Sequence, residues 1–144
     1  MKFVAGLICL ALLSVGARAD FAQVGALAFN LPPGLKLQTQ PRESTGEAAY
    51  SHWLAEDGRS IEVYVYAHYI RQERGGIVAA NKDSIEVAGQ RTKLIETKIF
   101  FGEPKRVLAV YLNFGDMIYL IVGDKMTVKD FLKILQSVDL TEGK

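Results

Sequence analysis

Residues able to do acid–base or metal chemistry are few in this 144-residue chain. Its only histidines are His52 and His68. Each lies in or beside a run in which apolar and polar residues alternate, as in a β-strand. The register predicted below for the hairpin over residues 48–69 puts the two imidazoles on opposite faces of the sheet. A shared metal ion is therefore not expected. We interpret His52 as a histidine at the margin of a sheet with a hydrogen-bond partner.

The carboxylates lack the neighbours that catalysis requires. Glu56 and Asp57 lie at a predicted turn, where their polarity explains them. Glu86 and Glu96 flank a predicted hairpin, where salt bridges on the strand face are the simpler account. The chain has no nucleophile elbow, paired-histidine zinc motif, calcium loop or phosphate-binding glycine loop. The sequence therefore predicts no catalytic residue, no metal, no cofactor and no enzymatic activity.

One group of side chains indicates a binding surface, because large aromatics on an exposed sheet face are typical of partner or ligand sites. Four residues of the predicted hairpin over 48–69 are expected to share the face that points away from the core: Trp53, Tyr64, Tyr66 and His68. The alternative is that residues 21–30 or 70–83 cover them, since tyrosine also suits half-buried sheet faces. The segment 70–83 is a candidate binding loop through Arg71 and Arg74, with a helical turn at 77–81.

Asp57-Gly58 predicts a tight hairpin that joins the strands 48–56 and 60–69. A two-residue turn there sets Tyr50 opposite Val65, and His52 opposite Val63. In that register Tyr50, His52 and Leu54 belong to the core face. Trp53 then belongs to the opposite face, together with Tyr64 and Tyr66.

The other elements follow from turn residues and periodicity. Residues 21–29 are apolar and fit either a short helix or a strand. A turn at 31–34 precedes a strand at 35–40, and further strands are predicted at 84–87, 92–100, 106–114 and 117–123. The pair 106–114 and 117–123 is apolar on both faces, which places it in the middle of a sheet. Thr127 is predicted to cap an amphipathic helix that closes the domain. The predicted fold class is therefore α+β: an antiparallel β-sheet built from hairpins and packed by a C-terminal helix.

The first nineteen residues have the three parts of a secretory signal: Lys2, an apolar run and the exit Ala17-Arg18-Ala19. The run is too short to cross a bilayer comfortably, although an uncleaved anchor stays open. We expect residues 1–19 to be a signal peptide and residues 20–144 a single domain. Without Lys2 and Arg18 the mature chain has fifteen basic and sixteen acidic residues. This balance gives no electrostatic case for nucleic acid.

Several turn and core segments resemble a known domain. They are Leu31-Pro32-Pro33-Gly34-Leu35-Lys36, Val87-Ala88-Gly89, Tyr119-Leu120-Ile121-Val122-Gly123 and Phe131-Leu132-Lys133-Ile134-Leu135-Gln136-Ser137-Val138. Their order is similar to that of a small extracytoplasmic domain of unknown function in bacterial anti-sigma-factor-type proteins, with a PsbP-like α+β fold. The resemblance implies an antiparallel sheet with helical cover and a non-enzymatic sensing or binding role. It supplies no site residues.

Together these features predict an exported, non-enzymatic binding or accessory protein of the bacterial envelope, periplasmic or secreted, with no integral membrane segment after processing. Its expected partner is an envelope protein or a small ligand. The alternative function is a small-ligand or lipid carrier, which would need a cavity lined by the aromatic residues.

Overall fold

The computed structural model describes residues 20–38, 48–67, 79–99 and 104–141. The expected signal peptide at 1–19, the second histidine His68, and Arg71 and Arg74 of the candidate binding loop lie outside these ranges. The described elements are β1 (Asp20–Val24), β2 (Leu27–Leu31), β3 (Lys36–Leu37), β4 (Ala49–Leu54), β5 (Ser60–Ala67), β6 (Ala79–Val87), β7 (Gln90–Ile99), β8 (Pro104–Phe114), β9 (Met117–Asp124), α3 (Val128–Gln136) and β10 (Asp139–Leu140).

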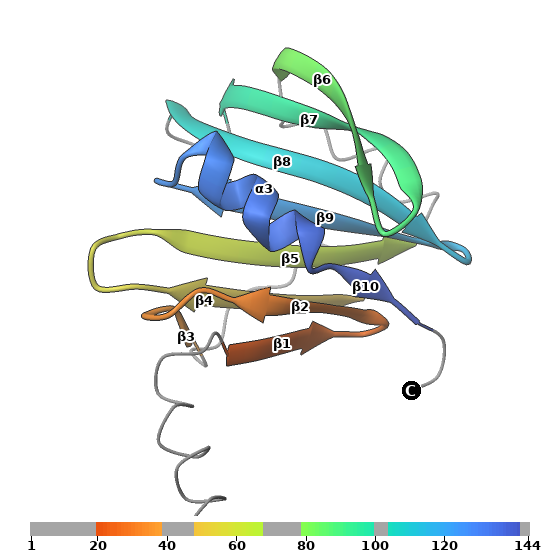
Figure 1. Ribbon diagram of the computed structural model, residues 1–144, viewed down its shortest axis with the longest axis horizontal. Coiled ribbons are helices and arrows are strands. Elements are labelled where there is room, and N and C mark those ends of the chain that lie inside the picture. The colour runs from red at the N-terminus through yellow and green to blue at the C-terminus, as the bar shows by residue number, and fades with distance from the viewer. Residues whose placement is uncertain (1–19, 39–47, 68–78, 100–103, 142–144) are drawn as a thin grey trace, which may run out of the picture.

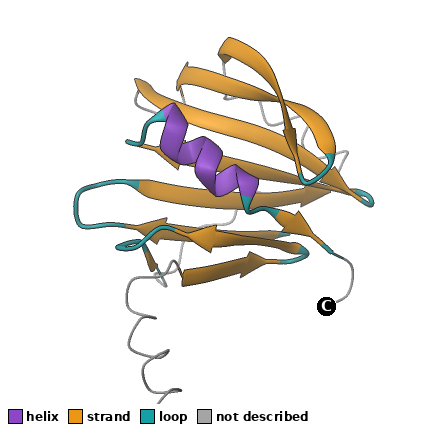
Figure 2. Ribbon diagram, viewed as in Figure 1, coloured by secondary structure: helices purple, strands orange, loops and turns teal. Residues whose placement is uncertain are grey.

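The strands form two sheets in which every described pairing is antiparallel. The large sheet has the order β3-β4-β5-β9-β8-β7-β6, and the small sheet has the order β1-β2-β10. Figures 1 and 2 show α3 and the small sheet lying across the same face of the large sheet. The architecture is mostly antiparallel β with one described helix, which agrees with an α+β fold built from hairpins.

The pair β8–β9 lies inside the large sheet, as its two apolar faces predict. Val110 and Ile121 are fully buried on the face towards α3. Ala109 and Val122 are equally buried on the other face, in a second and smaller cluster. The sheet therefore separates two apolar clusters, and β9 is its central strand.

The closing helix α3 begins as predicted. The Thr127 hydroxyl accepts a hydrogen bond from the Asp130 backbone N–H at 3.1 Å, which satisfies one of the donors left open at a helix start. Phe131, Ile134 and Leu135 bury the inner side of the helix. This packing locks α3 onto the sheet.

The N-terminal segment is a β-hairpin, which decides between the two predicted alternatives. Gly25 has a φ of 59°, and it stands first in the two-residue turn between β1 and β2. The Tyr119 hydroxyl accepts a hydrogen bond from the Ala26 backbone N–H at 2.9 Å and so ties this turn to β9. Strand β10 then pairs with β2 and completes the small sheet.

The register predicted for β4–β5 is wrong by one residue. Ala49 faces Val65 and Trp53 faces Ile61, because the turn holds three residues between Ala55 and Arg59 instead of two. The Ala55 N–H donates to the Arg59 carbonyl at 2.9 Å, which closes the turn. A turn of this length takes a glycine at positive φ, and Gly58 has a φ of 96°.

The shift exchanges the two faces of β4 but leaves those of β5 as predicted. Trp53 joins Val63 in the cluster beneath α3 and the small sheet. Tyr50, His52 and Leu54 lie on the opposite face, contrary to the prediction that they form the core face.

Other boundaries also differ from the predictions, and the differences at β6 and β3 are the largest. Strand β6 begins at Ala79 instead of residue 84, so residues 79–81 are strand and not the predicted helical turn. Strand β3 is only two residues long. The turn between β6 and β7 uses Ala88-Gly89, both at positive φ, as a two-residue hairpin of this type requires.

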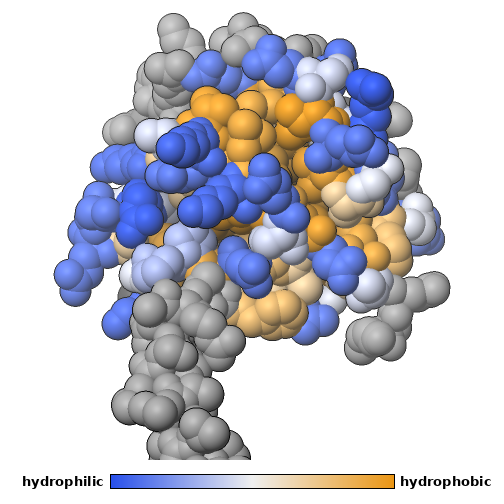
Figure 3. Space-filling model, in the orientation of Figure 1, coloured by the Kyte–Doolittle hydropathy of each residue, from blue (hydrophilic) through white to orange (hydrophobic). Residues whose placement is uncertain are grey.

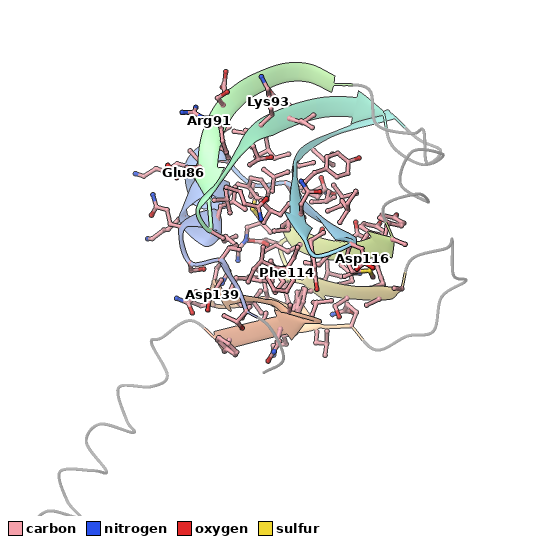
Figure 4. The ribbon with its side chains drawn as sticks, turned by 90° about the vertical axis from the view of Figure 1, so that its right-hand side faces the viewer. Glu86, Arg91, Lys93, Phe114, Asp116 and Asp139 are labelled. Carbon is pink, nitrogen blue, oxygen red and sulfur yellow. The ribbon has the colours of Figure 1, made fainter. Side chains whose placement is uncertain are left out.

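One end of the molecule carries charged side chains on its outermost strands. Figure 4 shows Glu86 on β6, and Arg91 and Lys93 on β7, pointing outward. Glu86 and Arg91 are cross-strand partners of opposite charge. These charges solvate the β6 edge of the large sheet.

Candidate functional site

The predicted aromatic face is not one surface. Trp53 is 5% exposed, and its ring meets Phe29 edge to face, with centroids 5.4 Å apart at 79°. It packs between the two sheets, where it stabilises the core. The expectation that Trp53 joins Tyr64 and Tyr66 is therefore wrong, and the three-residue turn is the reason.

Tyr64 and Tyr66 do share the opposite face of the sheet. Their rings stack with centroids 6.1 Å apart, and Tyr50 lies against Tyr64 at 4.9 Å. The Tyr50 hydroxyl donates to a Glu62 carboxylate oxygen at 2.5 Å. Tyr64 and Tyr66 are 4% and 2% exposed, so these rings belong to the second apolar cluster and are not an open platform.

The same register change moves His52 to the other face of the sheet. His52 faces Glu62 across β4–β5, on the face of Tyr64 and not on the predicted core face. The structure does not describe His68, so it does not give the relation of the two imidazoles. Within the described part of the chain, no three His, Cys, Asp or Glu residues gather as a metal site would require.

Three connections that are far apart in the sequence meet where α3 begins: the turn after β2, the β4–β5 turn and the segment between β9 and α3. Strands β5 and β9 pair with Ser60 opposite Asp124, so the turn before β5 lies beside the segment after β9. Side-chain contacts confirm this: a Cβ on Gly58 would lie 3.1 Å from Lys125 Cδ, and one on Gly34 would lie 3.3 Å from Arg59 Nη2. Figure 1 shows these connections at one end of the fold, where α3 begins.

Three adjacent hollows follow these connections. The first, of about 440 Å³, includes Leu108, Lys125 and Val128. The third, of about 480 Å³, includes Lys36, Leu54 and Glu56 beside the β4–β5 turn. The second lies between them, since it shares Met126 with the first and Arg59 with the third.

We call the second hollow, of about 330 Å³, the end groove. Its lining residues are Asn30, Pro32, Pro33, Arg59, Met126, Asp130, Lys133, Ile134 and Ser137. One wall is the proline turn after β2, and the other is the outer side of α3. In Figure 3 hydrophilic side chains cover the outer side of α3, and apolar side chains lie beside it on the sheet.

Arg59 is held in place by its own turn. Its Nε donates to both carboxylate oxygens of Asp57, at 3.0 and 2.9 Å, and its backbone N–H donates to Asp57 at 3.1 Å. These backbone and side-chain hydrogen bonds from Arg59 lower the pKa of Asp57 below its ordinary value. Because Nε forms the hydrogen bonds to Asp57, the Nη2 end of the guanidinium extends towards Gly34.

The helix wall supplies the other charges. Lys133 and Asp130 are exposed, and neither forms an ion pair with any described residue. Ser137 is already committed, because its hydroxyl accepts from the Asn30 N–H at 2.9 Å and donates to the Ile134 carbonyl at 2.7 Å. The end groove therefore offers one anchored guanidinium, one ammonium and one carboxylate around a partly apolar floor.

This arrangement suits recognition. The described residues that line the groove include no nucleophile beside a base and no pair of carboxylates forced to different pKa values. Cations beside apolar surface bind an acidic group that is attached to an apolar body. The sequence prediction missed Arg59, Met126 and Lys133, and the only local signal was the cation that follows the Asp57-Gly58 turn.

No helix in the described part of the chain is long and apolar enough to cross a membrane. No protein-family model matches the chain, and no curated protein matches it. Among solved structures the chain is similar to cyanobacterial PsbP (CyanoP) from Synechocystis sp. PCC 6803. That similarity covers 87% of this chain and 94% of CyanoP, with a TM-score of 0.55 and 12% identity. The fold of this chain is therefore PsbP-like.

Proposed function

We propose that this chain is an exported, non-enzymatic binding protein of the bacterial envelope. The end groove would receive an acidic, partly apolar segment of a partner protein. The observation that carries the proposal is the meeting of Arg59 and Lys133 beside Met126 in one groove. The signal-like leader supports export.

The groove fits a segment of mixed character. An acidic side chain would meet the ammonium of Lys133, which has no ion pair among the described residues. An apolar neighbour would lie on Met126, Ile134 and the two prolines. The adjoining hollows extend this surface on both sides, which favours an extended segment over a compact ligand. The resemblance to extracytoplasmic domains of anti-sigma-factor-type proteins agrees with a binding or sensing role.

A photo-crosslinking residue at Met126 in the full chain, expressed in its native envelope, tests the proposal. We expect capture of one partner, and we expect Lys133→Glu to reduce that capture at least tenfold by placing a second carboxylate beside Asp130. Lys129→Glu is the matched control, since Lys129 is exposed on the same helix but does not line the groove. Equal loss in both variants, or capture that neither changes, would refute the groove as the site.

A second candidate is a small-ligand carrier, because a hollow of about 330 Å³ lies within the size range of small-molecule sites, although its lining contains none of the aromatic residues expected for a carrier. Its ligand would carry a carboxylate or phosphate on an apolar body. Native mass spectrometry of the mature chain purified from the envelope distinguishes the two functions. A bound molecule that Lys133→Glu removes and Lys129→Glu retains supports the carrier.

A further inference from the structure

The described sheets end in four edge strands, and three of them have the features that prevent edge-to-edge pairing. Strands β3 and β10 are two residues long, which is too short to template a partner. Strand β6 is long, but Asp83 and Glu86 are charged and exposed along it. The fourth edge, β1, is five residues long and carries no charge after Asp20.

The backbone of β1 has a row of groups directed away from β2. Val24 and Leu27 close the two-residue turn and therefore form a hydrogen-bonded pair, so the bonded positions alternate from there to Ala22. Phe21 and Gln23 fall between them, and their N–H and C=O groups point to the open edge. The other side of β2 agrees, since the N–H of Asn30, opposite Phe21, donates to Ser137 instead of β1.

The side chains on this strand favour pairing with another apolar strand. Phe21 is 67% exposed and is the most exposed large apolar side chain described. Gln23 is exposed on the same face, whereas Ala22 and Val24 point into the core. An uncharged edge with an exposed aromatic ring is an unprotected pairing surface.

We propose that β1 pairs antiparallel with β1 of a second copy of this chain, around a two-fold axis at Ala22. The two open positions lie symmetrically about Ala22, so Phe21 of each copy falls opposite Gln23 of the other. Both open positions are then hydrogen-bonded in both copies. The small sheets join into one six-stranded sheet, and the contact is isologous.

The occupant is a second copy because the edge is complementary to itself. In the antiparallel register the two Phe21 rings become diagonal neighbours on one face, within reach of each other. No like charges oppose each other at positions 21 to 24, so electrostatics does not disfavour the pair. The contact is small, and we expect a dissociation constant on the order of micromolar or weaker.

Sedimentation equilibrium of the mature chain, residues 20–144, tests the proposal over a range of concentrations. We expect a monomer–dimer equilibrium whose dissociation constant rises at least tenfold in Phe21→Lys and in Gln23→Lys. Leu37→Lys is the matched control, because it adds the same charge at another exposed apolar position, 54% exposed, on the β3 edge. Fluorescence of Trp53, which lies in the core, verifies that each variant is folded.

The register of the proposed β1–β1 pair can be measured separately by NMR. In a dimer of mixed isotope labelling, an intermolecular contact between the two Ala22 α-protons is expected, since they form the non-hydrogen-bonded pair at the axis. Protection of the Phe21 and Gln23 amides from exchange should increase with concentration. A monomer at millimolar concentration, a dimer equally sensitive to Leu37→Lys, or protection that appears only with a foreign peptide would overturn the proposal.

Discussion

Gly123 in the central strand β9 sets how closely α3 can approach the sheet. A Cβ at this position would lie 2.7 Å from Phe131 Cδ1 and 2.9 Å from Cε1, which is closer than side chains pack. Phe131 is fully buried, so its ring has no free space to occupy, and Met126 Sδ is 3.2 Å from the same point. Replacing Gly123 with alanine must therefore displace the helix or strain the ring.

Two opposing effects decide the sign of the Gly123→Ala change. Overpacking a core costs about 1–3 kcal/mol. Removing a glycine from the interior of a strand gains about 0.5–1 kcal/mol. The contact distances place the overpacking cost above the gain, and we expect Gly123→Ala to lower the free energy of unfolding by about 1–2 kcal/mol. For a domain of this size, that corresponds to a fall of about 4–8 °C in Tm.

Urea unfolding monitored by the fluorescence of Trp53, the only tryptophan, measures the change. Phe131→Leu provides the second arm of a double-mutant cycle, because leucine has no rigid ring and can turn its methyl groups away. In that background Gly123→Ala should be neutral or stabilising. A Gly123→Ala protein that is more stable than wild type would refute the close approach of α3 to β9.

Three other perturbations test local contacts. Tyr119→Phe removes the acceptor of the Ala26 N–H, and we expect a loss of about 0.5–1.5 kcal/mol by urea unfolding with faster exchange of that amide. Thr127→Ala removes the helix cap and should cost about 1 kcal/mol in the same assay, whereas Thr127→Ser should cost less. Because Arg59 lowers the pKa of Asp57 in the folded state, the stability from this carboxylate is complete above its ordinary pKa and is lost as the pH falls through the folded value. Wild type should therefore lose its advantage over Asp57→Asn below about pH 4, and an NMR titration midpoint at or above the ordinary carboxyl value would contradict the pairing.

Local chemistry predicted the parts of the fold that depend on neighbours in sequence. Thr127 and the apolar spacing after it predicted α3, and Asp57-Gly58 predicted the β4–β5 hairpin, although not its register. The two-sided apolar pattern of β8 and β9 placed them inside the sheet. Residues 21–29 fit both a helix and a strand in sequence, and the turn of the observed hairpin is held by Tyr119, which is distant in the chain.

The candidate site could not be predicted because it depends on pairing between strands that are distant in the sequence. Arg59 follows β4, Met126 follows β9, and only the pairing of Ser60 with Asp124 makes them neighbours. No period or turn residue encodes that pairing. The convergence of the two positions is therefore a property of the sheet order.

The error in the β4–β5 register changes which residues are candidates for binding. A glycine turn of two residues and one of three share the same Asp57-Gly58 signal, yet they differ by one residue in register. That single residue moves Trp53 from a supposed binding face to a ring contact with Phe29 in the core. Arg59 closes the turn at either length, so the end groove does not depend on this register. The length of the turn therefore fixes the core around Trp53, whereas the pairing of β5 with β9 brings Arg59 beside Met126.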